Sequence, residues 1–193
     1  MSGGKANFFS IFCFRLFECR KKMSLIFMKL RGLKTGTLTG KIDRFYCLWP
    51  HQLKIGHNVA IQRNVYIHIA HPFSDIHQVQ IGDNSFIGAN TEINCSSRVL
   101  IGKDVLIASS CTLVDSGHRY SEFKLIKDQS TTEKPIIIAD DVWIGTQSAI
   151  LEGVKIGVGA IVAAGSLVKN DIPANQIWGG VPAKFLKNRF NEK

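Results

Sequence analysis

The sequence lacks a long apolar run. The longest uncharged stretch near its start, residues 6–14, ends at Arg15 and is far shorter than the ~20 residues that a helix needs to cross a bilayer. Arg15, Glu18 and Arg20 interrupt the apolar region of any secretory signal, and no small-residue cleavage motif follows them. We therefore expect neither a spanning helix nor a cleaved leader.

Regularly spaced cysteines are also missing. The five cysteines are an odd number, and no two of them form a CxxC pair, which argues against a zinc ribbon and against a disulfide scaffold. We expect reduced thiols in a cytoplasmic protein, serving mainly as small buried side chains. The chain has 193 residues, of which 45% are apolar and 20% charged, a composition that excludes wholesale disorder and fits one globular domain.

The formal net charge of +9 is unevenly distributed along the chain. Residues 1–34 hold eight basic residues and one acidic residue, a net of +7, whereas the remainder holds 16 basic and 14 acidic residues, a net of +2. Because the body is nearly neutral, we expect no nucleic-acid partner.

The basic N-terminal segment also contains a cluster of phenylalanines between residues 8 and 17. Aromatic residues beside Lys and Arg are typical of a helix that lies on an anionic leaflet, so peripheral contact with the inner face of a membrane is one interpretation. A helix packed on the rest of the protein, or on a neighbouring subunit, is the other.

From residue 55 onward an aliphatic residue recurs every six positions. A small or β-branched residue follows four positions later, and glycine or asparagine often occupies the positions between them. This period fits short strands joined by tight turns, three strands to a coil, with glycine and asparagine in the turns. The aliphatic positions are Ile55, Ile61 and Ile67; Ile81, Ile87 and Ile93; Ile101, Ile107 and Leu113; and Ile138, Ile144, Ile150, Ile156, Val162 and Val168.

The repeat predicts a mainly β protein in which residues 55–173 form a parallel β-helix. A basic, aromatic-rich and helical N-terminal segment, residues 1–54, precedes it, and a short C-terminal tail, residues 174–193, follows it. Short breaks occur after Ile67 and Ile93, and a polar, charged loop at residues 116–135 interrupts the coils. A long insertion in a regular solenoid is usually functional or disordered.

Two stretches of the chain resemble a known family. Residues 101–120 (IGKDVLIASSCTLVDSGHRY) and residues 140–187, which include the DDVWIG and GVPAK motifs, are similar to hexapeptide-repeat acyltransferases, closest to the galactoside, maltose and capsule-sugar O-acetyltransferase group. The resemblance covers roughly residues 55–188. It implies a left-handed β-helix, a homotrimer with active sites between subunits, acetyl-CoA as co-substrate and no metal.

The resemblance implies that His118, at the mouth of the insertion, is the general base. Acetyl transfer to a hydroxyl needs such a base, a donor that holds the oxyanion, and a cleft that aligns both substrates. Asp115 and Glu122 lie close to His118 in sequence. They are candidates to orient its imidazole, or else ordinary solvated carboxylates.

The resemblance also implies where the two substrates bind. Glu92 and Asn94, one coil before His118, are the candidates for contact with the sugar, although either is also compatible with an ordinary turn or exterior position. Lysine replaces the arginine that many relatives carry near the nucleotide phosphates, which substitutes a point charge for a bidentate contact. Trp143 either walls the cofactor cleft or packs on the exterior of the coils. The candidates for contact with acetyl-CoA are Trp143, Thr146, Ala164, Lys169, Lys184 and Lys187.

A zinc hydratase of the γ carbonic anhydrase type is a rival on the same fold. It needs three histidine ligands, but the position five residues after His118 is Phe123, and no histidine follows residue 118. We therefore predict an acetyl-CoA-dependent O-acetyltransferase that modifies a sugar hydroxyl in surface polysaccharide or lipopolysaccharide. The alternatives are an acetyltransferase for an antibiotic hydroxyl and a non-catalytic, membrane-associated β-helical scaffold.

Overall fold

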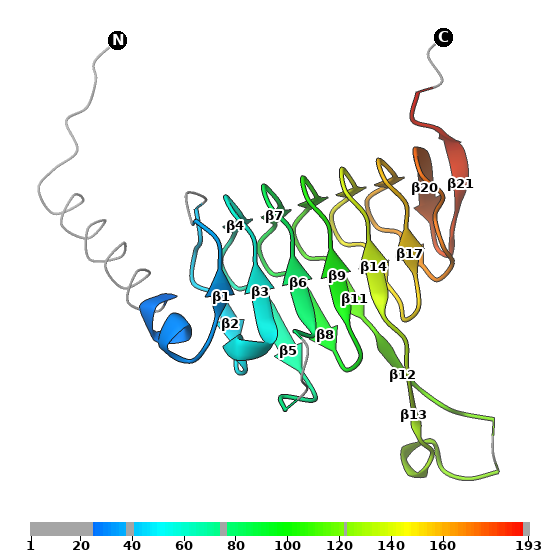
Figure 1. The fold of residues 1–193 in the computed structure, drawn as a ribbon. Coiled ribbons are helices and arrows are strands. Elements are labelled where there is room, and N and C mark those ends of the chain that lie inside the picture. The colour runs from blue at the N-terminus through cyan, green and yellow to red at the C-terminus, as the bar shows by residue number, and fades with distance from the viewer. Residues whose placement is uncertain (1–24, 38–40, 74–76, 122, 191–193) are drawn as a thin grey trace, which may run out of the picture.

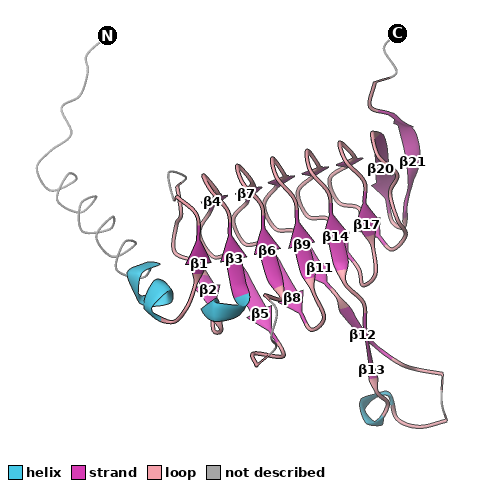
Figure 2. Cartoon of the chain, viewed as in Figure 1, coloured by secondary structure: helices cyan, strands magenta, loops and turns pink. Residues whose placement is uncertain are grey.

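A computed structural model describes residues 25–37, 41–73, 77–121 and 123–190. In these ranges most strands belong to one coil that winds along a prism with three faces (Figures 1 and 2). Helical structure there is confined to residues 25–30 and the short 3-10 turns η1 (Pro50–Gln52) and η2 (Ile126–Asp128), and none of it is long and apolar enough to span a bilayer. The predicted mainly β architecture and its parallel β-helix are confirmed.

Each face of the prism is a sheet to which successive coils contribute one strand, and the pairing is parallel except between the last two strands of sheet B. Sheet A contains β1 (Lys34–Thr35), β3 (Leu53–Ile55), β6 (Val79–Ile81), β9 (Val99–Ile101), β14 (Ile136–Ile138) and β17 (Lys155–Ile156). Sheet B contains β4 (Ala60–Ile61), β7 (Phe86–Ile87), β10 (Leu106–Ile107), β15 (Trp143–Ile144), β18 (Ile161–Val162), β20 (Gln176–Gly180) and β21 (Ala183–Asn188). Sheet C contains β2 (Tyr46–Cys47), β5 (Tyr66–Ile69), β8 (Glu92–Cys95), β11 (Thr112–Val114), β16 (Ala149–Ile150) and β19 (Leu167–Val168).

The repeated aliphatic residues form the core of the prism. In sheet A the register aligns one isoleucine from each coil, and each member of this column is at most 3% exposed. Burial of such a side chain stabilises the fold by about 1.5–3 kcal/mol, so each coil adds a comparable contribution. The column consists of Ile55, Ile81, Ile101, Ile138 and Ile156.

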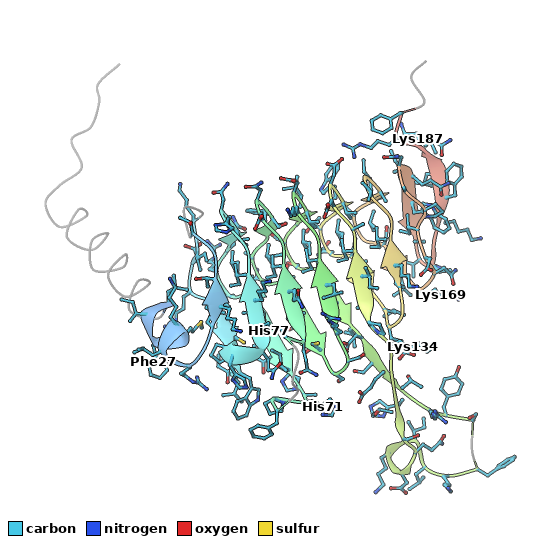
Figure 3. The ribbon with its side chains drawn as sticks, in the orientation of Figure 1. Phe27, His71, His77, Lys134, Lys169 and Lys187 are labelled. Atoms are coloured by element: carbon cyan, nitrogen blue, oxygen red, sulfur yellow. The ribbon has the colours of Figure 1, made fainter. Side chains whose placement is uncertain are left out.

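The coil begins before residue 55, where the sequence repeat becomes regular. Strand β1 pairs with β3 and β2 pairs with β5, so residues 34–35 and 46–47 already belong to the stack of coils. In the helical residues 25–30, Met28 is buried in the core, whereas Ile26, Phe27 and Leu30 are exposed (Figure 3). The phenylalanines of residues 8–17, and the helix predicted for them, lie outside the described residues.

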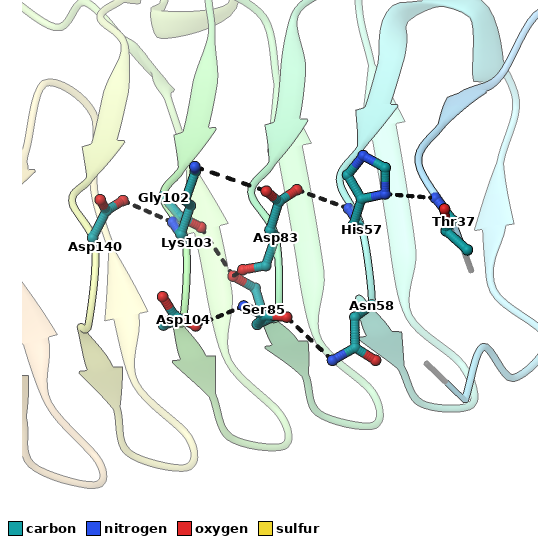
Figure 4. Close-up of polar contacts among 10 residues, drawn as sticks. Thr37, His57, Asn58, Asp83, Ser85, Gly102, Lys103, Asp104 and Asp140 are labelled. Atoms are coloured by element: carbon teal, nitrogen blue, oxygen red, sulfur yellow. Dashed lines mark hydrogen bonds and ion pairs between the residues drawn. The ribbon is translucent and has the colours of Figure 1, made fainter. Parts of the chain in front are cut away.

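Asparagine and glycine occupy the turns for a conformational reason. Among the described residues, nine non-glycine residues have φ between +52° and +61°, and Asn58, Asn64, Asn84 and Asn90 are among them. Asparagine tolerates this left-handed region because its short amide bonds locally. Here the amides also connect coils: Asn58 Nδ2 donates to Asn84 Oδ1 at 3.1 Å, and Asn84 Nδ2 donates to Asp104 Oδ1 at 3.0 Å (Figure 4).

Two antiparallel hairpins depart from the parallel coil. The insertion at 116–135 contains β12 (Ser116–His118) paired with β13 (Thr131–Glu133), and it projects from the prism at the bottom of Figure 1. The C-terminal residues, predicted as a tail, contain the hairpin β20–β21, which pairs with β18 and extends sheet B. A hairpin at this position covers the edge of β18 that would otherwise be open to pairing with another chain.

Candidate active site

His118 is the last residue of β12, and its side chain is exposed. The hairpin fixes its backbone: the register sets His118 opposite Thr131, and Arg119 N donates to the Ser130 carbonyl at 3.2 Å. No hydrogen bond joins its imidazole to another described residue. The imidazole is therefore accessible to a molecule that approaches from outside the prism.

Asp115 fits neither interpretation of its sequence position: it makes no hydrogen bond to His118, and it is not a solvated carboxylate. It is completely buried, and its two carboxylate oxygens accept hydrogen bonds from Ser96 N at 2.7 Å and Ser97 N at 2.9 Å. Its carbonyl accepts from Lys134 N at 2.9 Å. Asp115 therefore ties the preceding coil to both ends of the hairpin. Glu122, the other candidate, lies outside the described residues.

The structure places Glu92 and Asn94 on the outer surface of sheet C, one coil before β11. Their neighbours in β8, Ile93 and Cys95, face the core. In register, Asn94 lies between His68 and Val114, and Val114 precedes the hairpin by two residues. Asn94 is half-buried and Glu92 is exposed. Asn94 thus stands in the outer row that leads toward the hairpin of His118.

Two further polar residues meet beside this row, and neither was identified from the sequence. His71 follows β5 and Glu133 ends β13, and His71 Nε2 lies 3.4 Å from Glu133 Oε1. The loop that contains His71 follows β5, and the insertion that contains Glu133 follows β11. Each of these strands is the third of its coil, so the loop and the insertion leave the prism at the same corner. His71 and Glu133 are 62 positions apart, so no local motif links them. The place of each loop within the six-residue repeat was the sequence signal that could have predicted their proximity.

Thr146 and Ala164, predicted to contact the pantetheine, lie side by side on successive coils. Gly165 N donates to the Thr146 carbonyl at 2.8 Å, and a Cβ on Gly145 would meet Ala164 N at 2.5 Å. The Thr146 hydroxyl donates to the Ser109 carbonyl at 2.6 Å. Thr146 and Ala164 are exposed, so a surface of small residues runs along the corner between sheets B and C.

The other predicted cofactor residues do not all gather at this corner. Trp143 points outward from β15, is 52% exposed, and lies in register between Leu106 and Ile161. Lys184 and Lys187 are exposed on β21. Lys169 follows β19 at the corner between sheets C and A, well away from Lys187 (Figure 3). One chain therefore does not bring Lys169 to the corner of Thr146.

The cysteines that the structure describes are buried and free of disulfides. Burial raises the pKa of the Cys47 thiol to about 11 and raises the pKa of Cys111. Burial, together with the nearby Asp115 carboxylate, raises the pKa of Cys95. These thiols are therefore protonated and poorly nucleophilic near neutral pH. Across the described ranges, no group of three or more His, Cys, Asp or Glu side chains is arranged to hold a metal ion.

An open groove of about 530 Å³ lies on sheet A, away from His118. Its lining includes Lys34, Lys54, His57, Asp83 and Lys103, and none of the predicted site residues. The hydrogen bond from His57 N, followed by the charge of Lys103, lowers the pKa of Asp83 (Figure 4). Asp83 therefore stays ionised and offsets part of the positive charge of the groove.

Comparison with known proteins identifies relatives with the same repeat. A family model described as the hexapeptide repeat of succinyl-transferase matches residues 78–113 and 135–169, and the gap between the two matches holds most of the insertion hairpin. Galactoside O-acetyltransferase of Escherichia coli K12 is 35% identical over 133 residues, which is 69% of this chain and 62% of that enzyme. Alignments with three curated relatives span 37% to 62% of their lengths.

Solved structures agree with this likeness. A hexapeptide-repeat-containing acetyltransferase of Vibrio cholerae, crystallised with acetyl coenzyme A, is 31% identical and superposes with a TM-score of 0.63 over 72% of each chain. AntD, an N-acyltransferase of Bacillus cereus crystallised with dTDP and 3-hydroxybutyryl-CoA, is 25% identical. It superposes with a TM-score of 0.73 over 86% of this chain and 88% of AntD.

Proposed function

The chain belongs to the hexapeptide-repeat acyltransferases, and from this premise we propose that it transfers an acetyl group from acetyl-CoA to a saccharide hydroxyl. The observation that carries the proposal is the position of His118. This exposed imidazole stands on a hairpin that leaves the prism where the family match is interrupted, beside the outer row that contains Asn94. Galactoside O-acetyltransferase, crystallised with coenzyme A, supplies the sugar and the O-acetyl chemistry of the proposal.

In the proposed reaction, the neutral imidazole of His118 takes the proton of the acceptor hydroxyl while the hydroxyl oxygen attacks the thioester carbonyl. The carbon–sulfur bond then breaks, the acetyl ester forms, and the coenzyme A sulfur leaves as a thiolate that takes the proton back from the His118 imidazolium. A direct transfer needs no acyl-enzyme. The buried, protonated thiols of Cys47, Cys95 and Cys111 fit this route, because an acyl-enzyme on one of these cysteines would need an accessible thiolate.

We place acetyl-CoA along the corner that contains Thr146 and Ala164. Small exposed side chains leave room at this corner for an extended pantetheine. Trp143 would form a wall beside the bound cofactor. Lys184 and Lys187 on β21 would contact its phosphates. Lys169 lies at the same type of corner as His118, between sheets C and A. In a homotrimer with shared sites, His118 and Lys169 of one subunit would face the Thr146 corner of the next.

The test is release of coenzyme A thiol from acetyl-CoA with panels of free sugars, nucleotide sugars, polysaccharides and antibiotics. We expect acceptor-dependent thiol release with at least one saccharide, and an acetyl ester in the product by mass spectrometry. Turnover confined to an antibiotic would favour the xenobiotic alternative. If no panel raises thiol release above the background with the full-length protein, the acetyltransferase proposal is wrong.

Acylation of an amino sugar is a second candidate, and the likeness to AntD favours it. AntD is an N-acyltransferase that has been crystallised with dTDP-4-amino-4,6-dideoxyglucose, and the likeness covers more of this chain than that to the Vibrio cholerae enzyme does. The same imidazole would take the proton lost by an attacking amine. Alkaline hydroxylamine distinguishes the products, because it cleaves an acetyl ester and leaves an amide intact.

A further inference from the structure

The insertion hairpin presents two different faces. Its register sets Ser116 opposite Glu133, Gly117 opposite Thr132, and His118 opposite Thr131. Because side chains alternate along a strand and directly paired residues share a face, Gly117 and Thr132 lie on one face. The other face carries Ser116, His118, Thr131 and Glu133.

The face with Gly117 and Thr132 is attached to the next coil. The Thr132 hydroxyl donates to Glu152 Oε1 at 2.9 Å, and a Cβ on Gly117 would come within 3.5 Å of the same carboxylate oxygen. A Cβ on Gly117 would also come within 3.1 Å of Thr132 Oγ1, so glycine leaves room for the hydroxyl that makes this contact. This anchor leaves the opposite face, with His118, directed away from the contact with Glu152.

Glu133 leans along its strand toward the row that contains His118. Its Oε1 lies 3.5 Å from Thr131 Oγ1, and Thr131 is the residue directly opposite His118. The same oxygen lies 3.4 Å from His71 Nε2, in the loop that follows β5. His71 and Thr131 thus hold one carboxylate oxygen of Glu133, and no hydrogen bond joins its Oε2 to another described residue.

We propose that Glu133 is a positioning residue for His118: when the substrates are bound, Oε2 of its carboxylate accepts the N–H of the imidazole nitrogen that does not take the acceptor proton. The inference rests on the proposed function, in which His118 is the base. Diagonal pairs on an antiparallel hairpin lie within reach of long side chains. A carboxylate there fixes the tautomer and stabilises the imidazolium that forms during proton transfer.

The sign of the electrostatic effect follows from the charges around the hairpin. A carboxylate at Glu133 stabilises the imidazolium that His118 becomes during proton transfer. The other charged or titratable groups next to the hairpin are His71 from the loop after β5, Arg119 and Lys134 beside the strands, Asp115 in the interior and Glu152 on the opposite face. Asp115 already accepts two backbone hydrogen bonds. Among these groups, Glu133 is the carboxylate on the His118 face.

The experiment compares Glu133→Gln, Glu133→Asp and the control Glu152→Gln in the full-length protein. The control removes a carboxylate charge from the anchored face of the same hairpin, and Gln keeps an oxygen that can accept from Thr132. For Glu133→Gln we expect kcat/KM to fall roughly 10–100-fold and the acidic limb of its pH profile to move to lower pH. Glu133→Asp should restore part of kcat/KM and move the acidic limb part of the way back. Glu152→Gln should keep the acidic limb of the parent protein.

The ring ¹⁵N chemical shifts of His118, measured by NMR and assigned with the His118→Ala spectrum, provide a readout independent of turnover. One tautomer of the neutral imidazole should dominate in the parent and in Glu152→Gln, and the two tautomers should mix in Glu133→Gln. An unchanged tautomer ratio and an unchanged acidic limb in Glu133→Gln would overturn this inference, even if His118→Ala is inactive. Full activity in His118→Ala would instead overturn the proposed base. The two failures are therefore distinguishable.

Discussion

A single histidine carries the proposed chemistry, so its removal is the most direct test at the residue scale. His118→Ala should lower kcat by about 10²–10⁴-fold, because the acceptor hydroxyl would lose its proton acceptor. Affinity for acetyl-CoA, measured by calorimetry, should change little because Thr146 and Ala164 are untouched. His57→Ala is a suitable control, since His57 lies in a turn on a different corner of the prism. Parent-level turnover in folded His118→Ala would contradict the mechanism.

Cys47 makes stability sensitive to alkaline pH. Burial raises its pKa from 9.0 to about 11, so the unfolded chain loses this proton at a lower pH than the folded chain does. The associated stability is fully present below pH 9 and is lost as the pH rises to about 11. Between pH 9 and pH 11, the unfolding free energy of Cys47→Ala should therefore fall less than that of the parent protein, by up to about 2–3 kcal/mol. Denaturation at pH 8 and pH 11 measures it, and equal slopes for parent and variant would contradict the expectation.

At the scale of the element, the turns depend on residues that accept a left-handed backbone. Asn84 has φ of +58° and bonds to the equivalent turns of both neighbouring coils. Asn84→Ala should lower the unfolding free energy by about 1–2 kcal/mol, because alanine adopts this conformation at a cost and cannot make either bond. Asn84→Gly should lose less, since glycine accepts the conformation. Urea denaturation distinguishes them, and equal losses would mean that backbone strain is unimportant at this turn.

The hexads predicted the coils because each aliphatic position has one physical role, to face a narrow core. Where the pattern is incomplete, prediction failed: Thr35 and Cys47 belong to an early coil whose spacing is irregular. The hairpin β20–β21 was described as a tail because its antiparallel pairing has no six-residue signature. The six-residue period predicts the strands that repeat along the chain, and it gives no information about strands that pair only once.

In the candidate site too, local sequence patterns predicted some residues, and contacts between distant segments were missed. His118 was identified from a local motif, whereas Glu133 and His71 meet only through the packing of two loops. Asp115 was assigned a possible role from proximity in sequence, but strand alternation turns it into the core. Three residues along an extended chain are enough to reverse the direction of a side chain. Sequence distance was therefore a poor guide to which carboxylate could serve the histidine.

At the scale of the whole molecule, shared active sites predict complementation between two inactive variants. His118→Ala removes the proposed base, and Ala164→Trp fills the exposed corner proposed for acetyl-CoA. In a homotrimer whose sites combine these features from different subunits, random mixing should restore about a quarter of the sites. Differently tagged chains, mixed by co-expression and assayed for thiol release, provide the measurement. No recovery, together with a single-chain mass by light scattering, would argue for sites within one subunit.

The basic N-terminal segment predicts binding to anionic membranes. Full-length protein should pellet with phosphatidylserine vesicles at low salt and be released at high salt, because each Lys or Arg near such a surface contributes about 1 kcal/mol. Replacing Arg20, Lys21 and Lys22 with glutamine should weaken pelleting. The same change at Lys103, Lys134 and Lys155, which are exposed and lie outside this segment, is the matched control. Equal pelleting by both triple variants would assign the attraction to overall charge, and no pelleting would favour a packing role.

The hydrogen bond between Lys134 N and the Asp115 carbonyl makes the insertion structurally separate from the stacked coils of the prism. The bond is 2.9 Å long and closes the base of the hairpin, so the chain leaves the coil and returns to it at almost the same place. The hairpin closes again where Arg119 N donates to the Ser130 carbonyl at 3.2 Å, so residues 120–129 should be able to change length without changing how neighbouring coils stack. Grafting these residues between relatives would test whether the tip of the insertion sets acceptor preference while His118 and the coils stay constant.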